Sequence, residues 1–229
     1  PDVENNQILY GLKALSNISS ATIEQIKAGR PYQSIVDFMN RCPLNKTAMI
    51  SLIKGGAFDD MMDRKMCMAW YLWEVCDKKS RLTLQNMPTL IKYGLLPEDT
   101  EERILARRVY EFNRYLKAIT KADKASYKDH YSLDTRAINF LNELGLEELM
   151  DSDNLAWFIN VKKWDKVYQK HMDVIREFLN NNKDELLNQL NSAIFMEDWN
   201  KYAKGTISAW EMEVLCFYYH EHELSCVNA

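Results

Sequence analysis

Apolar residues recur at helical spacing along most of this chain. Between Thr100 and Ala122 they follow one another at intervals of three to five, with arginine and lysine between them. The same period predicts helices over residues 161–179 and 184–202. Strand patterns are almost absent, and only Gln7–Tyr10 could extend briefly. The pattern therefore predicts an all-α fold built from many helices.

Capping residues mark the ends of further elements. Asp134 can begin a helix that Gly145 ends, and Asp153 can cap the helix that follows it. A Ser-x-x-Glu capping box that starts at Ser208 opens a helix over residues 210–219. The sequence has two candidate domain boundaries, one near residue 78 and one near residue 130. We use the first of them and divide the chain into residues 1–78 and 79–229.

A polar turn separates two short apolar helices near the N-terminal end. Ile18 is predicted to plug the space between these helices, and Asn17 tolerates the left-handed backbone that such a turn requires. Ser19 or Ser20 can cap the second helix, Ala21–Ala28. Free backbone N–H groups at a helix start can hold a phosphate without reading a base. A plain helical turn is the alternative.

A second unit of the same kind follows. Tyr32–Cys42 is predicted to form a helix, Pro43-Leu44 a turn, and Asn45 caps the helix Lys46–Lys54, which Gly55-Gly56 ends. Two adjacent hairpins can match the two strands of a duplex. The residues predicted to contact DNA in this region are Lys13, Asn17, Ile18, Ser19, Ser20, Lys27, Arg30, Asn45 and Lys46.

The composition narrows the class of protein. The hydrophobic fraction of 47% is ample for a core, and no apolar run reaches the roughly 18 residues that a membrane span needs. The five cysteines are odd in number and include no C-x-x-C pair, which favours reduced thiols in the cytoplasm over disulfides or a zinc knuckle. Pro1 is an unusual natural N-terminus, so we expect a piece of a longer chain.

The charge is unevenly distributed. The net charge is −4, yet residues 61–130 carry 14 basic and 10 acidic side chains, and residues 131–229 carry 9 and 17. Any phosphate-facing surface is therefore expected in the first 130 residues. Arg107 and Arg114 are predicted DNA contacts within a basic row, for which a solvated helix face is the alternative. That row comprises Arg103, Arg107, Arg108, Arg114, Lys117, Lys121, Lys124 and Lys128.

Two stretches resemble a known family. Residues 11–41 and 44–61, which end in LIKGGAFDDM, resemble the tandem helix-hairpin-helix region of the bacterial DNA polymerase III alpha subunit, a C-family polymerase. Residues 210–224, WEMEVLCFYYHEHEL, are similar to the segment that precedes the OB-fold domain in that family. Asn17 and Ser19 stand where the family has hairpin glycines, and Cys216 stands where it has another glycine. A divergent, phage-borne branch would account for these departures.

The resemblance implies DNA-directed DNA synthesis by the parent protein, with Mg²⁺ held by palm aspartates upstream of residue 1. Asp151-Ser-Asp153 is the only Asp-x-Asp here and lacks the family's context. We therefore expect a non-catalytic fragment without a cofactor of its own. It would grip duplex or primer–template DNA in the cytoplasm of a bacterium, or of the host cell if phage-encoded.

The resemblance also implies a sliding clamp and other replisome proteins as partners. The family carries a short clamp-binding peptide between the two stretches. Gln189, Ile194 and Phe195 give its outline, although inside a helical pattern, and Gln85–Leu90 is a second candidate. A core helix is the alternative for the first of these segments.

A rival interpretation makes the chain a helical protein-interaction module whose hairpins serve only for packing. The acidic C-terminal part and the missing glycines favour it. A third class, a helix-hairpin-helix DNA glycosylase, is not favoured, because this sequence has no Lys and Asp at the spacing that base excision needs after a glycine-rich hairpin. His220 and His222 are expected to be structural or to face a partner, and a zinc site is the alternative. An aromatic set is expected to be core, with base stacking as the alternative: Trp157, Phe158, Trp164, Tyr168, Trp199 and Tyr202. A methionine-rich set is also expected to be core, with a partner groove as the alternative: Met61, Met62, Met66, Met68, Trp70 and Trp73.

Overall fold

A computed structural model describes residues 11–122, 129–153, 156–218 and 220, so Gln7–Tyr10 lies outside the described residues. The chain folds as two compact units. Of the described residues, 11–78, 192–218 and 220 belong to the first, called here the hairpin unit, and those between 79 and 191 belong to the second, called the inserted unit. The sequence-based division into 1–78 and 79–229 differs from this one, because residues 192–218 pack with the N-terminal region.

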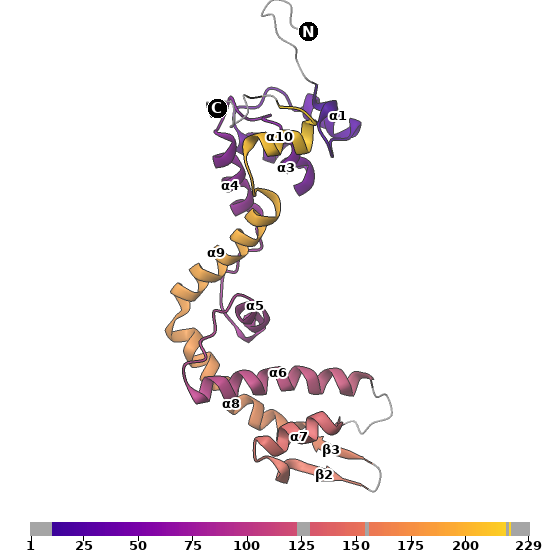
Figure 1. Ribbon diagram of the computed structural model, residues 1–229, viewed down its shortest axis with the longest axis vertical. Coiled ribbons are helices and arrows are strands. Elements are labelled where there is room, and N and C mark those ends of the chain that lie inside the picture. Colours follow the sequence, from indigo (N-terminus) through magenta and orange to yellow (C-terminus); the bar gives the residue numbers. More distant parts are fainter. Residues whose placement is uncertain (1–10, 123–128, 154–155, 219, 221–229) are drawn as a thin grey trace, which may run out of the picture. The chain divides into compact units, whose positions relative to one another are not determined.

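Helices dominate the described part of the chain, as the apolar pattern predicted. No helix within it is long and apolar enough to cross a membrane. The hairpin unit contains η1 (Leu12–Ala14), α1 (Ser20–Ala28), α2 (Ile35–Arg41), α3 (Lys46–Lys54), α4 (Arg64–Val75), the second half of α9 (Lys183–Tyr202) and α10 (Ile207–Leu215) (Figure 1).

Side-chain caps set where these helices begin. Ser34 accepts a hydrogen bond from the Asp37 N–H at 3.1 Å, so α2 starts three residues later than predicted. Thr206, rather than Ser208, caps α10 and accepts from the Ala209 N–H at 3.2 Å. The capping box predicted at Ser208 is therefore wrong, and Ser208 is buried inside the helix instead.

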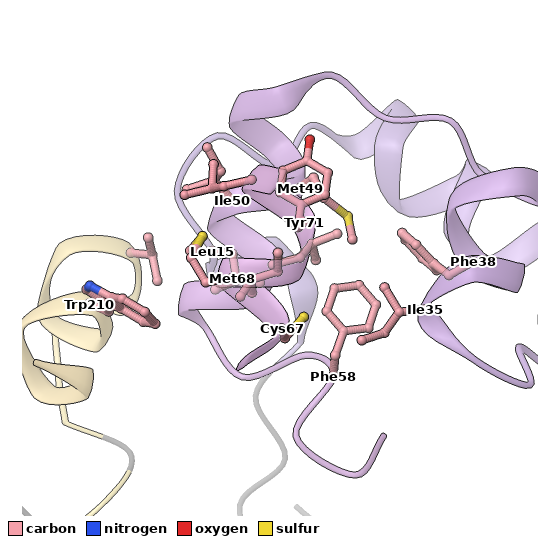
Figure 2. Close-up of a cluster of buried hydrophobic side chains, with 14 of the residues drawn as sticks. Leu15, Ile35, Phe38, Met49, Ile50, Phe58, Cys67, Met68, Tyr71 and Trp210 are labelled. Carbon is pink, nitrogen blue, oxygen red and sulfur yellow. The ribbon is translucent and has the colours of Figure 1, made fainter. Parts of the chain in front are cut away.

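The core of the hairpin unit contains residues from the N-terminal region together with residues of α10. Figure 2 shows Trp210 of α10 facing the cluster formed by α3 and α4. Trp210 and Met68 are almost completely buried, and Phe58 lies against Phe38 with ring centroids 5.0 Å apart. Burial of aromatic side chains of this size contributes strongly to stability. The hairpins therefore depend on α10 for a closed core.

The inserted unit is built around two long helices. α6 (Glu101–Ala122) packs along α8 (Val161–Asn181), and Trp164 of α8 is buried, with its Nε1 donating to Asn113 Oδ1 at 3.1 Å. The ring of Phe112 stacks on that of Phe140 at 4.2 Å. The remaining elements are η2 (Leu84–Asn86), α5 (Met87–Lys92), α7 (Thr135–Glu143), η3 (Glu147–Leu149) and the first half of α9.

A small antiparallel sheet in the inserted unit was not predicted. Its strands are β1 (His130–Leu133), β2 (Met150–Ser152) and β3 (Trp157–Asn160), in the order β1-β3-β2. Asp153 lies in the turn between β2 and β3, where its Oδ1 accepts from the Ala156 N–H at 2.8 Å. The prediction that Asp153 caps a helix is therefore wrong; Asn160 caps α8 instead.

Candidate nucleic-acid interface

The turn before α1 has the backbone of a tight hairpin. Asn17 adopts a left-handed conformation with φ of +64°, the region that glycine enters at no steric cost. Its Nδ2 donates to Ser51 Oγ at 3.2 Å, which ties the turn to α3. Ile18 is half-buried and packs against the core of the hairpin unit. The Asn17 side chain thus holds the turn in place, and Ile18 fills the space beneath it.

The start of α1 presents unused backbone donors. Ser19 caps the helix by accepting from the Thr22 N–H at 3.1 Å. The N–H groups of Ile18, Ser20 and Ala21 donate to no atom of the described residues. A nine-residue helix adds the positive end of its dipole at the same place. Such a start can hold an anion such as a phosphate.

Three cations line a pocket that runs along α1. Lys13, Lys27 and Arg30 line one pocket of about 470 Å³, together with Ser20, and we call it the cationic pocket. Glu24 shares the pocket, and its Oε1 lies 2.9 Å from Lys27 Nζ. The positive charge left over therefore comes from Lys13 and Arg30, both of which are exposed.

The second hairpin has a different arrangement. Asn45 caps α3 by accepting from the Ala48 N–H at 2.9 Å. Lys46 Nζ lies 2.7 Å from Asp198 Oδ2 and 4.7 Å from the ring centre of Tyr202. Lys46 is therefore paired inside the hairpin unit, and its predicted contact with DNA would require it to leave both partners.

A buried ionic network joins the two stretches that resemble the polymerase family. Arg64 Nη1 lies 2.8 Å from Glu211 Oε1, and both side chains are almost completely buried. Arg64 Nε also donates to Asp59 Oδ1 at 3.0 Å, and the Glu211 carboxylate contacts His220 Nδ1 at 2.6 Å. The network links the start of α4 to α10, and Arg64 Nη1 also donates to the Lys54 carbonyl at the end of α3 at 3.2 Å. Sequence reasoning missed it, because Arg64 and Glu211 lie 147 residues apart.

Glycine positions of the family pattern have structural reasons here. Gly56 has φ of +79°, and a Cβ there would come within 2.4 Å of Arg64 Nη2, so only glycine fits beside the network. Cys216 ends α10 with φ of +65°, and its N–H donates to Met212 O at 3.2 Å. Cys216 therefore occupies a left-handed position that suits the family's glycine.

The basic row on α6 divides into two halves. Arg103 lies 2.7 Å from Asp99 Oδ1, Arg107 pairs with Glu98 and Glu111, and Arg108 Nη2 lies 2.8 Å from Glu143 Oε2. The second half is without ion pairs among the described residues, since none of these pairs includes Arg114, Lys117 or Lys121. Lys117 Nζ lies over the ring of Tyr168. Lys124 and Lys128 lie outside the described residues.

Both candidate clamp-binding segments are folded. Gln189, Ile194 and Phe195 lie within α9, and Phe195 packs edge-on against Trp73 at 5.7 Å. Within Gln85–Leu90, the side chains of Met87 and Leu90 are completely buried. This is the core-helix arrangement, and an extended peptide would require each segment to unwind. Clamp binding at Gln189, Ile194 and Phe195 stays a prediction.

The remaining candidates show no assembled site. The described residues contain no cluster of His, Cys, Asp and Glu that could hold a metal ion. Asp151 lies on β2, 3.8 Å from Lys163 Nζ, and His222 lies outside the described residues. Trp164 is buried as expected for core, whereas Trp157 on β3 is 45% exposed.

Comparison with known proteins agrees with the geometry of the first hairpin. The family model "Helix-hairpin-helix motif" matches residues 2–67. Over 99% of its length the chain is 33% identical to the probable DNA polymerase YorL of Bacillus subtilis and to the DNA-directed DNA polymerase of Bacillus phage SPbeta. It spans only 18% of the length of each.

A third relative covers less of the chain. The DNA polymerase III subunit alpha of Thermus aquaticus is 38% identical over 74 residues, which are 29% of this chain and 6% of that protein. No solved structure matches the chain. With the hairpin turn, the capped helix start and the buried link to α10 in place, the chain carries a helix-hairpin-helix region of the DNA polymerase III alpha-like type.

Proposed function

We propose that the hairpin unit grips the DNA backbone without reading sequence, as a non-catalytic part of a longer DNA-directed DNA polymerase. The observation that carries this proposal is the cationic pocket along α1, which Lys13 and Arg30 line together with Ser20, a residue of the helix start with its unused N–H groups. Backbone donors and flexible cations contact phosphate and carry no base information. The substrate would be duplex product or primer–template DNA.

The chemistry of synthesis would reside elsewhere in the parent protein. Mg²⁺ held by palm aspartates would supply it there. In this chain Asp151 lies 3.8 Å from Lys163 Nζ and Asp153 accepts from the Ala156 N–H, and the described residues gather no cluster of acidic side chains that could hold a metal ion. The open half of the α6 row, Arg114 with Lys117 and Lys121, would add backbone contacts. The parent would act in the cytoplasm of a bacterium or of a phage-infected cell.

The test is fluorescence anisotropy of the chain on a labelled primer–template duplex across a salt series. The variant Lys13→Glu/Arg30→Glu should weaken binding and flatten the dependence of log K on log salt by roughly 2, since each lost phosphate contact removes about 0.9. Lys65→Glu/Lys204→Glu is the matched control, because it makes the same charge change at exposed sites outside the cationic pocket.

The outcome separates two interpretations. An equal loss in both variants would mean that only net charge matters and would sink the proposed site. Absence of binding by the unaltered chain at low salt would favour a protein-interaction module. The acidic excess of residues 131–229, with 17 acidic against 9 basic side chains, favours that second interpretation.

A further inference from the structure

An apolar pocket adjoins the cationic pocket. It has a volume of about 230 Å³, and its walls include Ile26, Phe38, Leu52 and Phe58, all of which are buried in the core of the hairpin unit. Its mouth includes Met61, which is 44% exposed. Its size fits one large apolar side chain inserted from outside.

The two pockets share residues and form one composite site. Leu12 and Arg30 line both pockets. Arg30 therefore places positive charge at the boundary, and Lys13 continues it into the cationic pocket. An apolar cavity beside two exposed cations recognises a ligand with the same two parts, one apolar and one anionic.

The walls of the apolar pocket suit a side chain better than a nucleobase. The polar group that Tyr32 brings to the wall is already used, because its hydroxyl donates to the Ile26 carbonyl at 2.8 Å. Arg41 stacks on the Tyr32 ring at 5.2 Å and donates to the Pro31 carbonyl at 2.8 Å, which holds this wall. Few donors or acceptors remain for the edge of a base, which in buried sites must be paired.

We propose that the composite site binds an acidic peptide of a partner protein, with a large apolar residue in the apolar pocket and carboxylates on Lys13 and Arg30. Cations beside a desolvated anchor pocket give such a peptide both affinity and orientation. The peptide and the DNA backbone would compete for these two cations. The inference goes beyond the proposed DNA grip, because DNA needs only the cations.

The test uses the full chain and a fluorescein-labelled peptide, Glu-Asp-Asp-Asp-Leu-Phe. The control peptide, Glu-Asp-Asp-Asp-Ser-Ser, keeps the charges and lacks the apolar residues. The blocking variant is Ala57→Phe, because Ala57 lines the pocket and is itself exposed, so that a larger side chain there spares the core. Val36→Phe on α2 is the matched variant, since Val36 is 52% exposed and does not line the pocket.

We expect Ala57→Phe to weaken binding of the first peptide roughly 10- to 100-fold, the factor for losing burial of one large side chain. Val36→Phe should leave that binding unchanged, and Ala57→Phe should leave duplex DNA affinity unchanged. Melting temperatures of both variants, compared with that of the unaltered chain, show that they fold.

Three results would overturn the proposal. Equal binding of both peptides would show attraction by charge alone. Failure of the first peptide to bind at millimolar concentration would leave the apolar pocket without this ligand, whatever the DNA result. Equal loss of peptide and single-stranded DNA binding in Ala57→Phe would assign the pocket to a nucleotide instead. Since DNA binding is measured in the same series, failure of the peptide and failure of the DNA grip are distinguishable.

Discussion

At the scale of single residues, the first hairpin has asparagine where glycine is usual, and a side-chain hydrogen bond offsets the backbone strain at that position. A left-handed backbone costs an ordinary residue about 1–2 kcal/mol, and asparagine less, because its short polar side chain can bond locally. Asn17 uses that side chain to reach Ser51 on α3. Cys216 adopts the same conformation at the end of α10, where no hydrogen bond of its thiol is recorded among the described residues.

This difference leads to a prediction at Asn17. Asn17→Ala should lower the free energy of unfolding of the hairpin unit by about 1–2 kcal/mol, because alanine keeps the strain and loses the bond to Ser51. Asn17→Gly should change it by no more than about 0.5 kcal/mol, because the lost bond is offset by relief of strain. Urea unfolding followed by tryptophan fluorescence measures both. Ser16→Ala, at the exposed neighbouring position, is the control, and equal losses for alanine and glycine would refute the argument.

At the scale of elements, α4 concentrates buried titratable groups. Burial raises the pKa of the Cys67 thiol from 9.0 to about 12 and that of the Tyr71 hydroxyl from 10.0 to about 12. Both groups therefore stay protonated in the folded chain well above the pH at which they ionise in the unfolded chain. The unfolded state alone gains from deprotonation in that interval, so alkaline pH should destabilise the hairpin unit.

The corresponding prediction concerns the slope of stability against pH. Between pH 10 and 12 each group should lower the free energy of unfolding by about 1.4 kcal/mol per pH unit. The stability that Cys67 contributes is fully present only below pH 9. Tyr71→Phe removes one titrating group, so its urea midpoint should fall less steeply with pH than that of the unaltered chain. Tyr218→Phe, at a tyrosine 47% exposed, is the control. Parallel slopes for all three proteins would contradict the assignment.

Elements with a strong local signal could be predicted from the sequence, and elements held by distant partners could not. The helices at Lys46–Lys54 and Glu101–Ala122 follow their apolar period and agree with prediction to within one residue. The sheet could not be predicted, because its strands have only three or four residues and because α7 lies between β1 and its partner β3 in the sequence. Period alone does not reveal such pairing.

The same reasoning applies to the candidate site. Lys13, Lys27 and Arg30 stand close in sequence, and the structure brings them to one pocket. Lys46 has the same local context, yet Asp198 pairs with it from a position 152 residues away. Only the structure distinguishes the paired Lys46 from the cations of the pocket, since the sequence near Lys46 does not indicate its acidic partner.

At the scale of the whole molecule, the chain leaves the hairpin unit at Lys78 and re-enters it at Ser192. The two ends of the inserted unit meet: the Lys79 N–H donates to Asn191 Oδ1 at 2.7 Å, and Asn191 Nδ2 donates to Lys79 O at 3.0 Å. An insertion with adjacent ends can be removed without stretching the rest of the chain.

The final prediction follows from this continuity. A chain in which a short Gly-Ser linker joins Lys78 to Ser192 should unfold cooperatively and keep the part of its duplex affinity that belongs to the cationic pocket. Residues 1–78 alone should lose more than about 3 kcal/mol of stability, because Trp210 no longer fills the core and Arg64 is left with its Glu211 partner missing. Circular dichroism in urea and duplex anisotropy measure both proteins. If residues 1–78 proved as stable as the linked chain, α10 and the buried network would not contribute to the stability of the hairpins. If the linked chain failed to fold, the hairpin unit would depend on residues 79–191 for its stability.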